Sequence, residues 1–450
     1  MHEFKMLLVK TNTKQGNDIL VISSNLVNEL ELKENQNISL RVGQLQKTFS
    51  LKIEKTTRNN NSIHLSSHVA RTLLLHAERR YGYFYTDGDL RIGPVVGVMA
   101  ELSNQTGRPF GGQSFFIKQL MTSGYSIGQL CFGFSPFGIN WKSKTIQGYT
   151  YGERGWIKSV FPIPDVVYPR QQGYSNIKLQ IRRRLEAMGV KFLNPALIGK
   201  WQTYRIIRGN PQLIPYIPDT KLINSFQEVD GMIKKYHAIY LKPVTGSMGR
   251  NIVRVVKKRN SPVYQYQYQM NDQSFSGSAS NLAQLRASLR PVMGNRTYIA
   301  QKQINLLRSD GNIVDVRIMV QKDHTGLWSI TGMACRVGRS GSITSNISRG
   351  GSGRKLESVL KSKFEDEEQR NNIVEEIKFL ALESAKCLEK SIGPSGEMGV
   401  DIGIDKDGHI WFIEANLRPA RQVFTLIGEK QTRMLSVGKP MLYSRYLAGF

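Results

Sequence analysis

The chain has 450 residues, 40% of them hydrophobic and 22% charged, a composition that excludes a mainly disordered or fibrous protein. At the usual size of about 150 residues per domain, this length predicts about three domains. The chain holds 62 Lys and Arg against 35 Asp and Glu, and its formal net charge of +27 predicts either a solvated basic surface or an anionic partner, such as a nucleotide, a polyanionic substrate, nucleic acid or an anionic surface.

Residues 1–88 have the pattern of a small β domain. Short apolar runs alternate with polar residues from Met6 to about Leu75, and polar turns such as 58–61 separate the runs. Alternation with a period of two is typical of half-buried strands. We therefore expect a small β domain or barrel here.

Residues 89–195 alternate between strand and helix patterns. The apolar run 94–99 leads through a glycine-bearing loop to a helical pattern from Ser114 to Met121. A second helix, N-capped by Ser175, is predicted by the spacing of Ile177, Ile181, Leu185 and Met188. Such alternation favours a parallel sheet covered by helices, so we expect an α/β domain.

Residues 196–450 mix strands and helices and make up the third expected domain. Its clearest helix is predicted from Asn371 to Ile392, where apolar residues recur at helical spacing and Gly393 provides a stop. Two segments of this domain, described below, carry the residues with recognisable chemistry.

No apolar run approaches the roughly 18 residues that a membrane-spanning helix needs, and the run Met6–Val9 is too short for a secretory signal. We therefore expect a cytoplasmic protein without a membrane span. The cysteines Cys131, Cys335 and Cys387 lie far apart and form no CxxC pair. This spacing predicts free thiols rather than disulfides or a structural zinc site.

The first chemical segment is a strand that ends in a lysine and leads into a glycine-bearing loop. Lys242 closes the strand, and the loop contains Gly246, Ser247, Met248 and Gly249 before a second strand begins. The backbone N–H groups of such a loop can approach phosphate oxygens closely, and a lysine adds positive charge. The spacing is not that of a Walker A loop. The pattern therefore predicts either a hairpin flap over a nucleotide or an ordinary turn.

The second segment is a predicted hairpin of strands 398–404 and 410–416. Pairing would place Asp401 and Glu414 at comparable heights, and side-chain alternation would place Glu414 and Asn416 on one face. Three oxygen ligands of this kind suit Mg²⁺. The alternative is that Glu414 and Asn416 lie on the solvated face of an edge strand, although the strand around Glu414 is nearly apolar on both faces.

The lysine and glycine flap followed by an Asp…Glu-x-Asn hairpin resembles the pattern of ATP-grasp enzymes. Asp315 and Arg317 resemble the D-x-R strand of that superfamily. The stretch from Arg336 to Asn346, Gly350 and Gly351 is similar to an element of peptide-type carboxylate–amine ligases. The whole chain resembles the YheC/YheD family of ATP-grasp proteins from endospore-forming bacteria, whose members are described as spore-coat associated.

The resemblance implies a multidomain α/β and α+β fold, with a small N-terminal β domain over 1–88, a pre-ATP-grasp domain over 89–195 and the ATP-grasp fold over 196–450. It implies ATP and Mg²⁺ as cofactors. The implied nucleotide-binding residues are Lys200, Lys242, Gly246, Ser247, Met248, Gly249 and the hinge residues Gln301, Lys302, Gln303 and Ile304. The implied metal ligands are Asp401, Glu414 and Asn416. The hinge departs from many relatives, which carry an acidic residue there.

The resemblance also implies a ligase, in which a substrate carboxylate attacks ATP to give an acylphosphate and an amine then attacks the acyl carbon. Arg336 and Asn346 are the implied catalytic residues, and an ion pair with Asp315 is the alternative for Arg336. The implied partners are an unidentified carboxylate and amine, possibly anionic, from an amino acid, a peptide or a peptide-like polymer, and spore-coat proteins. The resemblance also implies that the protein is associated with the spore coat in the mother cell. A phosphotransferase and an ATP-binding coat assembly protein with weak or no catalysis are the alternatives, and no specific nucleic acid is expected.

Overall fold

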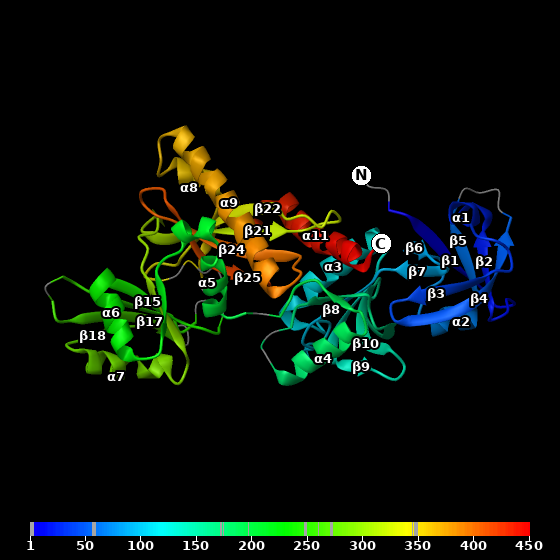
Figure 1. Ribbon diagram of the computed structural model, residues 1–450, viewed down its shortest axis with the longest axis horizontal. Helices are drawn as coiled ribbons and strands as arrows, with labels where there is room; N and C mark the ends of the chain where they lie inside the picture. Colours follow the sequence, from blue (N-terminus) through cyan, green and yellow to red (C-terminus); the bar gives the residue numbers. More distant parts are fainter. Residues whose placement is uncertain are drawn as a thin grey trace. The chain divides into compact units, whose positions relative to one another are not determined.

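The computed structural model describes residues 4–55, 60–171, 173, 175–196, 198–246, 250–259, 261–270, 273–343, 345 and 350–450 (Figure 1). The chain divides into two compact units. The first unit holds Met1–Asn194, Lys322–Leu327 and Val437–Phe450, and the second holds Pro195–Gln321 and Trp328–Ser436. Over the described ranges, no helix is both long and apolar enough to cross a membrane.

The first unit begins with a closed barrel whose strands follow the order β1-β5-β2-β4-β3-β7-β6. The bounds are β1 (Met6–Asn12), β2 (Ile19–Ser23), β3 (Asn37–Val42), β4 (Leu45–Glu54), β5 (Ser62–Ser66), β6 (Arg79–Thr86) and β7 (Asp89–Gly93), with helices α1 (Ser24–Glu29) and α2 (Ser67–Thr72). Alternate side chains such as Leu7 and Val9 are fully buried inside it. The β structure predicted from the alternating sequence is confirmed.

The first unit also holds a six-stranded sheet with the order β11-β10-β9-β8-β12-β13. Its strands are β8 (Val95–Met99), β9 (Leu130–Asn140), β10 (Thr145–Gly152), β11 (Gly155–Pro162), β12 (Val166–Pro169) and β13 (Lys191–Phe192). The predicted helices are confirmed as α3 (Ser114–Ser126) and α4 (Asn176–Ala187), and the Ser175 side chain caps α4 by accepting the N–H of Lys178 at 3.2 Å. The four strands β9, β8, β12 and β13 are parallel, as the βα alternation predicts.

One apolar cluster joins the barrel to this sheet, because buried barrel residues pack with Phe132, Phe161 and Leu185. A second cluster includes residues from the end of helix α11 (Lys430–Ala448), among them the buried Met441 and Tyr443. The Gln129 side chain donates a 2.7 Å hydrogen bond to the carbonyl oxygen of Met441. The last part of the chain is therefore built into the core of the first unit.

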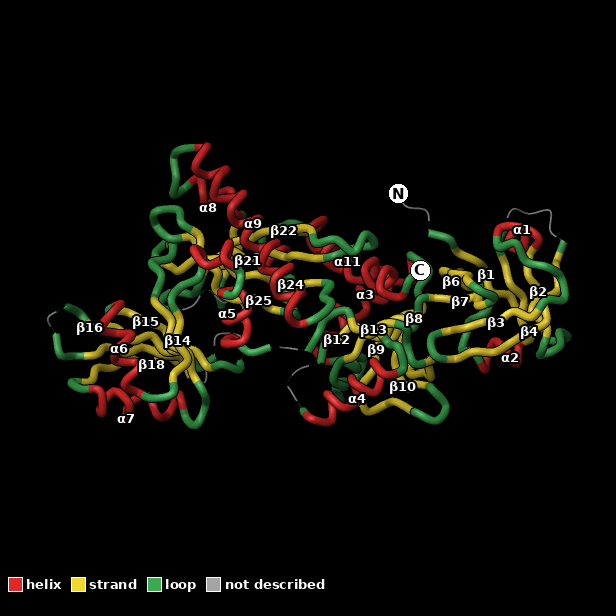
Figure 2. The backbone as a smooth tube through the Cα atoms, in the orientation of Figure 1, coloured by secondary structure: helices red, strands yellow, loops and turns green. Residues whose placement is uncertain are grey.

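The second unit contains an antiparallel sheet, here called the small sheet, with the order β14-β19-β15-β16-β17-β18 (Figure 2). The bounds are β14 (Thr220–Ile223), β15 (Ala238–Pro243), β16 (Val253–Lys257), β17 (Tyr264–Met270), β18 (Gln273–Ala279) and β19 (Tyr298–Lys302). Helices α6 (Phe226–Tyr236) and α7 (Leu282–Met293) pack on it through a shared apolar core, and helix α5 (Lys200–Arg208) and a 3-10 segment (Pro211–Tyr216) precede it. A capping box of Ser225 and Glu228 begins α6.

The larger sheet of the second unit has the order β23-β22-β21-β24-β25, with β20 paired to β21. Its strands are β20 (Arg308–Ser309), β21 (Asn312–Gln321), β22 (Ser329–Val337), β23 (Ser352–Arg354), β24 (Glu397–Ile404) and β25 (Ile410–Asn416), and its helices are α8 (Leu356–Lys361), α9 (Glu367–Ile392) and α10 (Gln422–Leu426). The predicted helix is confirmed as α9 and ends at Gly393, where φ is +98°. It begins four residues earlier than predicted because the Asp366 side chain accepts the N–H groups of Glu368 and Gln369.

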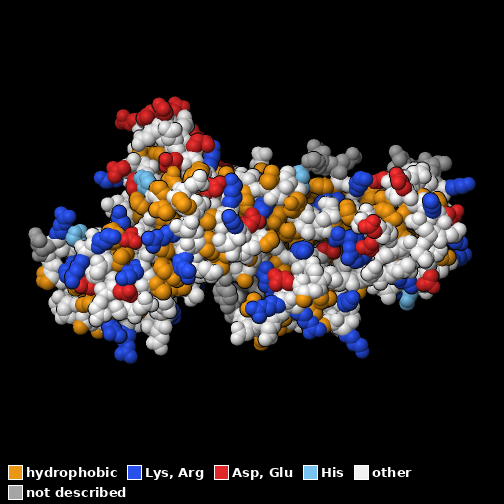
Figure 3. Space-filling view, in the orientation of Figure 1, with side chains coloured by type: hydrophobic (Ala, Val, Ile, Leu, Met, Phe, Trp, Pro, Cys, Tyr) orange, Lys and Arg blue, Asp and Glu red, His pale blue; other side chains and the backbone are white. Residues whose placement is uncertain are grey.

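The three cysteines are free thiols, as predicted, and Cys131 and Cys335 are buried. Acidic side chains gather over α8 and the start of α9 (Figure 3), a segment whose exposed acids include Glu357, Glu365, Asp366, Glu367 and Glu368. On the same face, basic side chains are spread over many elements. The net charge of +27 therefore does not form one compact basic patch on the face shown.

Candidate active site

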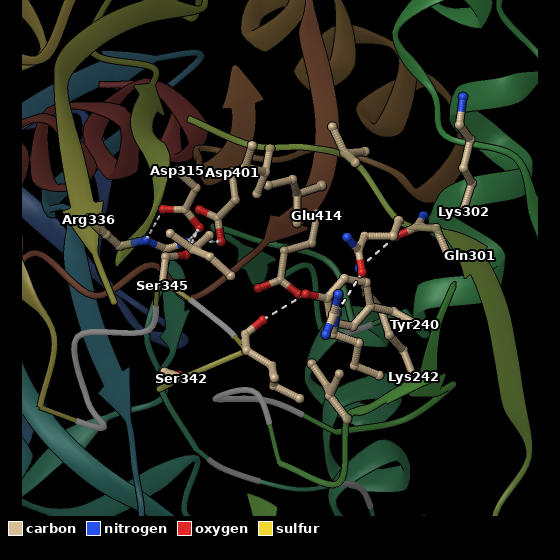
Figure 4. A pocket seen from close by; sticks show the side chains of 18 of the residues that line it. Tyr240, Lys242, Gln301, Lys302, Asp315, Arg336, Ser342, Ser345, Asp401 and Glu414 are labelled. Atoms are coloured by element: carbon tan, nitrogen blue, oxygen red, sulfur yellow. Dashed lines mark hydrogen bonds and ion pairs between the residues drawn. The ribbon is translucent and has the colours of Figure 1, made fainter. Parts of the chain in front are cut away.

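A cavity of about 500 Å³ is lined by both sheets of the second unit (Figure 4). The small sheet contributes Tyr240, Lys242, Arg254 and Gln301, and the larger sheet contributes Asp315, Arg336, Asp401 and Glu414. Helix α5 adds Lys200. The described residues that were predicted to bind nucleotide, to bind metal or to act in catalysis therefore line one cavity, with the exception of Asn416. Asn416 does not line the cavity but contacts Glu414, which does.

Lys242 reaches the cavity because it alternates along β15 with the core residues Ile239 and Leu241. Its Nζ donates a 2.6 Å hydrogen bond to Oε1 of Gln301 on the neighbouring strand β19. Burial lowers the pKa of Lys242 to about 8, an effect that Glu414 opposes and Lys200 reinforces. An anion in the cavity would restore the balance by favouring the charged ammonium group.

Lys200, the first residue of α5, connects this helix to the loop that follows β15. Its backbone N–H bonds the carbonyl oxygen of Val244 at 2.9 Å, and its Nζ donates to the carbonyl oxygen of Gly246 at 2.8 Å. The same Nζ lies 3.7 Å from Oε2 of Glu414. Ser247, Met248 and Gly249, the other predicted flap residues, lie outside the described part of the chain.

The hinge residues Gln301, Lys302, Gln303 and Ile304 all line the cavity. Gln303 accepts a 2.7 Å hydrogen bond from Nε of Arg254, which lies across the sheet on β16. The ammonium group of Lys302 points away from Glu414 (Figure 4) and lies 5.6 Å from the centre of the Trp411 ring. The hinge therefore offers amide groups to the cavity, while Lys302 contributes mainly its stem.

The hairpin of β24 and β25 has the predicted register, with Asp401 directly opposite Glu414. Asn416 donates from Nδ2 to Oε1 of Glu414 at 3.0 Å. Burial raises the pKa of Glu414, but Lys200, the Asn416 hydrogen bond, Arg336 and Lys242 together outweigh burial and lower the pKa to about 2. Glu414 is therefore an ionised carboxylate at neutral pH, surrounded by cations.

Arg336 lines the cavity and also forms the ion pair that was its alternative interpretation. Its Nε lies 2.7 Å from Oδ1 of Asp315, and its Nη2 lies 2.5 Å from Oδ2 of Asp315 and 2.8 Å from Oδ2 of Asp401. Burial alone would lower the pKa of Arg336, but Asp315 and Asp401 raise it above its usual range. Asn346, the second predicted catalytic residue, lies outside the described part of the chain.

The side-chain oxygens of Asp401, Glu414 and Asn416 fit Mg²⁺ better than a metal for which the protein must supply every ligand. Burial raises the pKa of Asp401, against the effect of Arg317 and Arg336. These guanidinium groups make three contacts to its two oxygens, which leaves about one of the four lone-pair directions for a metal. Among the described residues, no three His, Cys, Asp or Glu side chains are grouped for a metal. Two carboxylates and an amide suit Mg²⁺, which keeps water and phosphate ligands.

Several residues at the cavity were not predicted as site residues. Tyr240 lies two residues before Lys242 and on the same face of β15, so strand alternation contained the signal that would identify it. Arg254 pairs directly with Tyr240 across the sheet, and Ser345 donates a hydrogen bond to Asp315. These two contacts depend on long-range pairing that no local pattern encodes.

Comparisons with known proteins gave matches at both the sequence and the structure level. A family model described as YheC/D like ATP-grasp matches residues 189–447. Endospore coat-associated protein YheD from Bacillus subtilis (strain 168) is 28% identical over 397 residues, covering 85% of this chain and 85% of YheD. Endospore coat-associated protein YheC from the same strain is 24% identical over 313 residues, covering 67% of this chain and 84% of YheC. Among solved structures, the VanG D-Ala:D-Ser ligase from Enterococcus faecalis has 13% identity and a TM-score of 0.45, covering 78% of this chain and 98% of VanG.

Proposed function

Because this chain belongs to the YheC/D-like ATP-grasp family, we propose that it is an ATP- and Mg²⁺-dependent ligase that joins a carboxylate to an amine. The observation that carries the proposal is the convergence of Lys200, Lys242 and the ionised Glu414 in one cavity of about 500 Å³. Two ammonium groups beside a carboxylate suit a nucleoside triphosphate and its divalent cation. The substrates proposed are an amino acid, a peptide or a peptide-like polymer, and the names of YheD and YheC support a role in spore-coat formation.

The two lysines neutralise the α- and β-phosphates in this proposal. Lys200 and Lys242 come from separate elements, α5 and β15, so they can contact a triphosphate from two sides. The predicted flap, of which the structure describes Gly246, would cover the β- and γ-phosphates, and the hinge amides of Gln301 and Gln303 would face the base. Fixed positive charge of this kind lowers the cost of bringing a carboxylate nucleophile to an anionic phosphate.

Asp401, Glu414 and Asn416 would hold Mg²⁺ beside the phosphates. The ion supplies charge neutralisation for the transferred phosphoryl group when it is bound. Glu414 is suited to this role because its lowered pKa keeps it ionised, and Asn416 fixes one of its oxygens through the 3.0 Å hydrogen bond.

Arg336 stabilises the transferring phosphoryl group or the oxyanion that forms when the amine attacks the acylphosphate. Its guanidinium is held in the cavity wall by Asp315, so little reorganisation is needed as charge develops. We propose that Asn346 and the backbone of Gly350 and Gly351 assist Arg336 in this stabilisation, because their order in the sequence matches that of peptide-type carboxylate–amine ligases. The phosphoryl group leaves ATP for the substrate carboxylate, and phosphate leaves when the amide bond forms.

The test is release of ADP and phosphate by the purified protein with Mg²⁺ against a panel of amino acids, dipeptides and acidic peptides. We expect one carboxylate–amine pair to stimulate release and to give an amide detected by mass spectrometry. Glu414→Gln and Lys242→Ala should lower the rate at least 100-fold. Lys361→Ala, at an exposed position on α8, is the matched control and should leave the rate unchanged.

Three other outcomes would contradict the assignment of this protein as a ligase. A phosphate ester in place of an amide identifies a phosphotransferase. Tight binding of ATP without turnover by any pair favours an assembly protein that keeps the nucleotide as a structural ligand. Absence of nucleotide binding contradicts the proposed function as a whole.

A further inference from the structure

We propose that Asp315 and Arg317 are positioning residues that hold Arg336 and Asp401 in place for the reaction. The inference rests on the proposed function, because it takes Arg336 as the group that meets the transferring phosphoryl and Asp401 as a metal ligand. Asp315 and Arg317 lie two residues apart on β21, so their side chains leave the strand on the same face. Both are buried, with residue exposures of 3% and 6%.

The sheet register places each of the two residues opposite the side chain that it holds. Asp315 is directly opposite Arg336 on β22, and Arg317 is directly opposite Asp401 on β24. Strand β21 lies between these two neighbours. A single central strand thus aligns two functional side chains that are 65 positions apart in the chain.

The contacts of Asp315 fix both the position and the plane of the Arg336 guanidinium. The pair is bidentate, with distances of 2.7 Å and 2.5 Å, and the fork geometry of arginine allows few other orientations. Ser345 donates a further hydrogen bond to Oδ2 of Asp315. The aspartate therefore connects Arg336 to the loop that follows β22.

Arg317 holds Asp401 in the same bidentate manner, with Nε 2.5 Å from Oδ1 and Nη2 3.0 Å from Oδ2. A Cβ on Gly399 would lie 3.4 Å from Cδ and Cζ of Arg317 and 2.8 Å from Cβ of Pro419. A side chain at position 399 would thus clash with Pro419 and touch the Arg317 side chain. The fork orients Asp401 so that a metal would meet the free direction on Oδ1.

The two pairs are joined, because Nη2 of Arg336 also contacts Oδ2 of Asp401 at 2.8 Å. The order of charges along the network is Arg317, Asp401, Arg336, Asp315. Asp315, Arg336 and Asp401 line the cavity, whereas Arg317 acts from behind Asp401. Loss of Arg317 should therefore disturb metal binding first, and loss of Asp315 should disturb the phosphoryl-binding group first.

The experiment separates these two effects with full-length variants and defined probes. Mn²⁺ affinity is measured by electron paramagnetic resonance in the presence of AMPPNP, and affinity for ADP with aluminium fluoride reports on the site of the transferring phosphoryl. Arg317→Lys, which keeps the charge but loses the fork, and Arg317→Met should weaken Mn²⁺ binding by about 10- to 100-fold. Asp315→Asn should leave Mn²⁺ binding within about threefold and weaken ADP–aluminium fluoride by about 10- to 100-fold.

Glu397→Gln is the matched control, since Glu397 belongs to a buried ion pair with Arg421 of the same unit that does not line the cavity. The positioning roles predict opposite preferences for the two probes in the Arg317 and Asp315 variants, with no preference in the control. Wild-type Mn²⁺ affinity in both Arg317 variants, or the same preference in Glu397→Gln, overturns the inference. If the wild-type protein does not bind Mn²⁺ with AMPPNP at all, the proposed function fails first, and this inference fails with it.

Discussion

Strands β21 and β24 carry two buried ionic clusters, four positions apart, and only one of them adjoins the cavity. The first, here called the pocket cluster, consists of Asp315, Arg317, Arg336 and Asp401. The sealed cluster consists of Gln321, Glu397 and Arg421, with Gln321 directly opposite Glu397 in the same ladder that pairs Arg317 with Asp401. The Glu397 and Arg421 side chains are only 0% and 4% exposed.

The sealed cluster directs its polar atoms into the protein itself. Arg421 contacts Glu397 and donates to the carbonyl oxygens of Ser436 and Pro419 at 3.0 Å and 3.1 Å. Gln321 donates to Glu397 at 3.1 Å and to Ser436 at 2.9 Å. Backbone carbonyl groups accept hydrogen bonds from the donors here, whereas three of the four charged side chains of the pocket cluster line the cavity. Access to a cavity, rather than burial of charge, is therefore what distinguishes a candidate site from a structural ion pair on the same strands.

The largest expected effect is a loss of folding stability when the sealed cluster is disrupted. Glu397→Gln leaves Arg421 without its ionised partner in a buried site and should lower the free energy of unfolding by about 3–5 kcal/mol. Hydrogen exchange at the amides of β21 and β24 measures this loss locally. Nucleotide affinity of the folded fraction should equal that of the wild type, and a parallel loss of affinity would show that the two clusters act as one.

Turnover gives the next largest effect, on the pocket side of the comparison. Arg336→Gln should slow the release of ADP by about 10²–10³-fold, because the variant loses a charged donor that meets the transferring group. AMPPNP affinity should stay within about threefold. Steady-state kinetics with the substrate pair found in the panel checks this expectation, and an unchanged rate would make Arg336 a structural residue like Arg421.

The pH dependence of AMPPNP affinity tests whether the charge on Lys242 contributes to nucleotide binding in the cavity. The pKa of this half-buried lysine is about 8, so the ammonium group is present below pH 8 and is lost as the pH rises through that value. AMPPNP affinity should therefore fall above pH 8 by up to about tenfold per pH unit, one proton being linked to binding. Calorimetry from pH 7 to 9.5 measures the fall. Lys242→Arg remains charged and should flatten the profile, and an equally steep profile in that variant would assign the effect to another group.

The smallest expected effect is a loss of folding stability at an exposed helix cap, which serves as a comparison for the two buried clusters. Asp366 caps α9 at an exposed position, and Asp366→Ala should cost about 1 kcal/mol of stability by leaving N–H groups of the first turn unsatisfied. Urea unfolding measures the change, with Asp366→Asn as the control that keeps a capping oxygen. Any change of nucleotide affinity in Asp366→Ala would contradict a purely local role.

The sequence predicts the helices and the hairpin well because their signals are local. Ile177, Leu185 and Gly393 mark helix faces and ends through spacing alone, and the Asp401–Glu414 register follows from the short turn between their strands. The ion pair of Arg336 with Asp315, one of the two interpretations, is confirmed, and the catalytic role of Arg336 stays a prediction. The link from Arg336 to Asp401 could not be predicted, because it requires the registers of three strands at once.

Assembly of the sealed cluster was equally hidden from local patterns. Ser436 lies 115 positions from Gln321, and neither residue stands in a motif. Tertiary pairing rather than propensity decides such contacts. The predicted division at residues 88 and 195 stays a prediction. Lys322–Leu327 and Val437–Phe450 belong to the first unit, a grouping that composition along the chain does not reveal.

The packing of the α11 end has a consequence for synthesis on the ribosome. Gln129 cannot form its hydrogen bond to Met441 until 312 more residues have been translated. The buried Tyr443 is added to the same cluster two residues after Met441. The barrel can form early, but the cluster around α3 stays open while the whole second unit is being made. During that interval the cluster that contains Leu120 and Met121 of α3 lacks Met441 and Tyr443. Synthesis of α11, rather than emergence of the first domain, therefore completes the first unit.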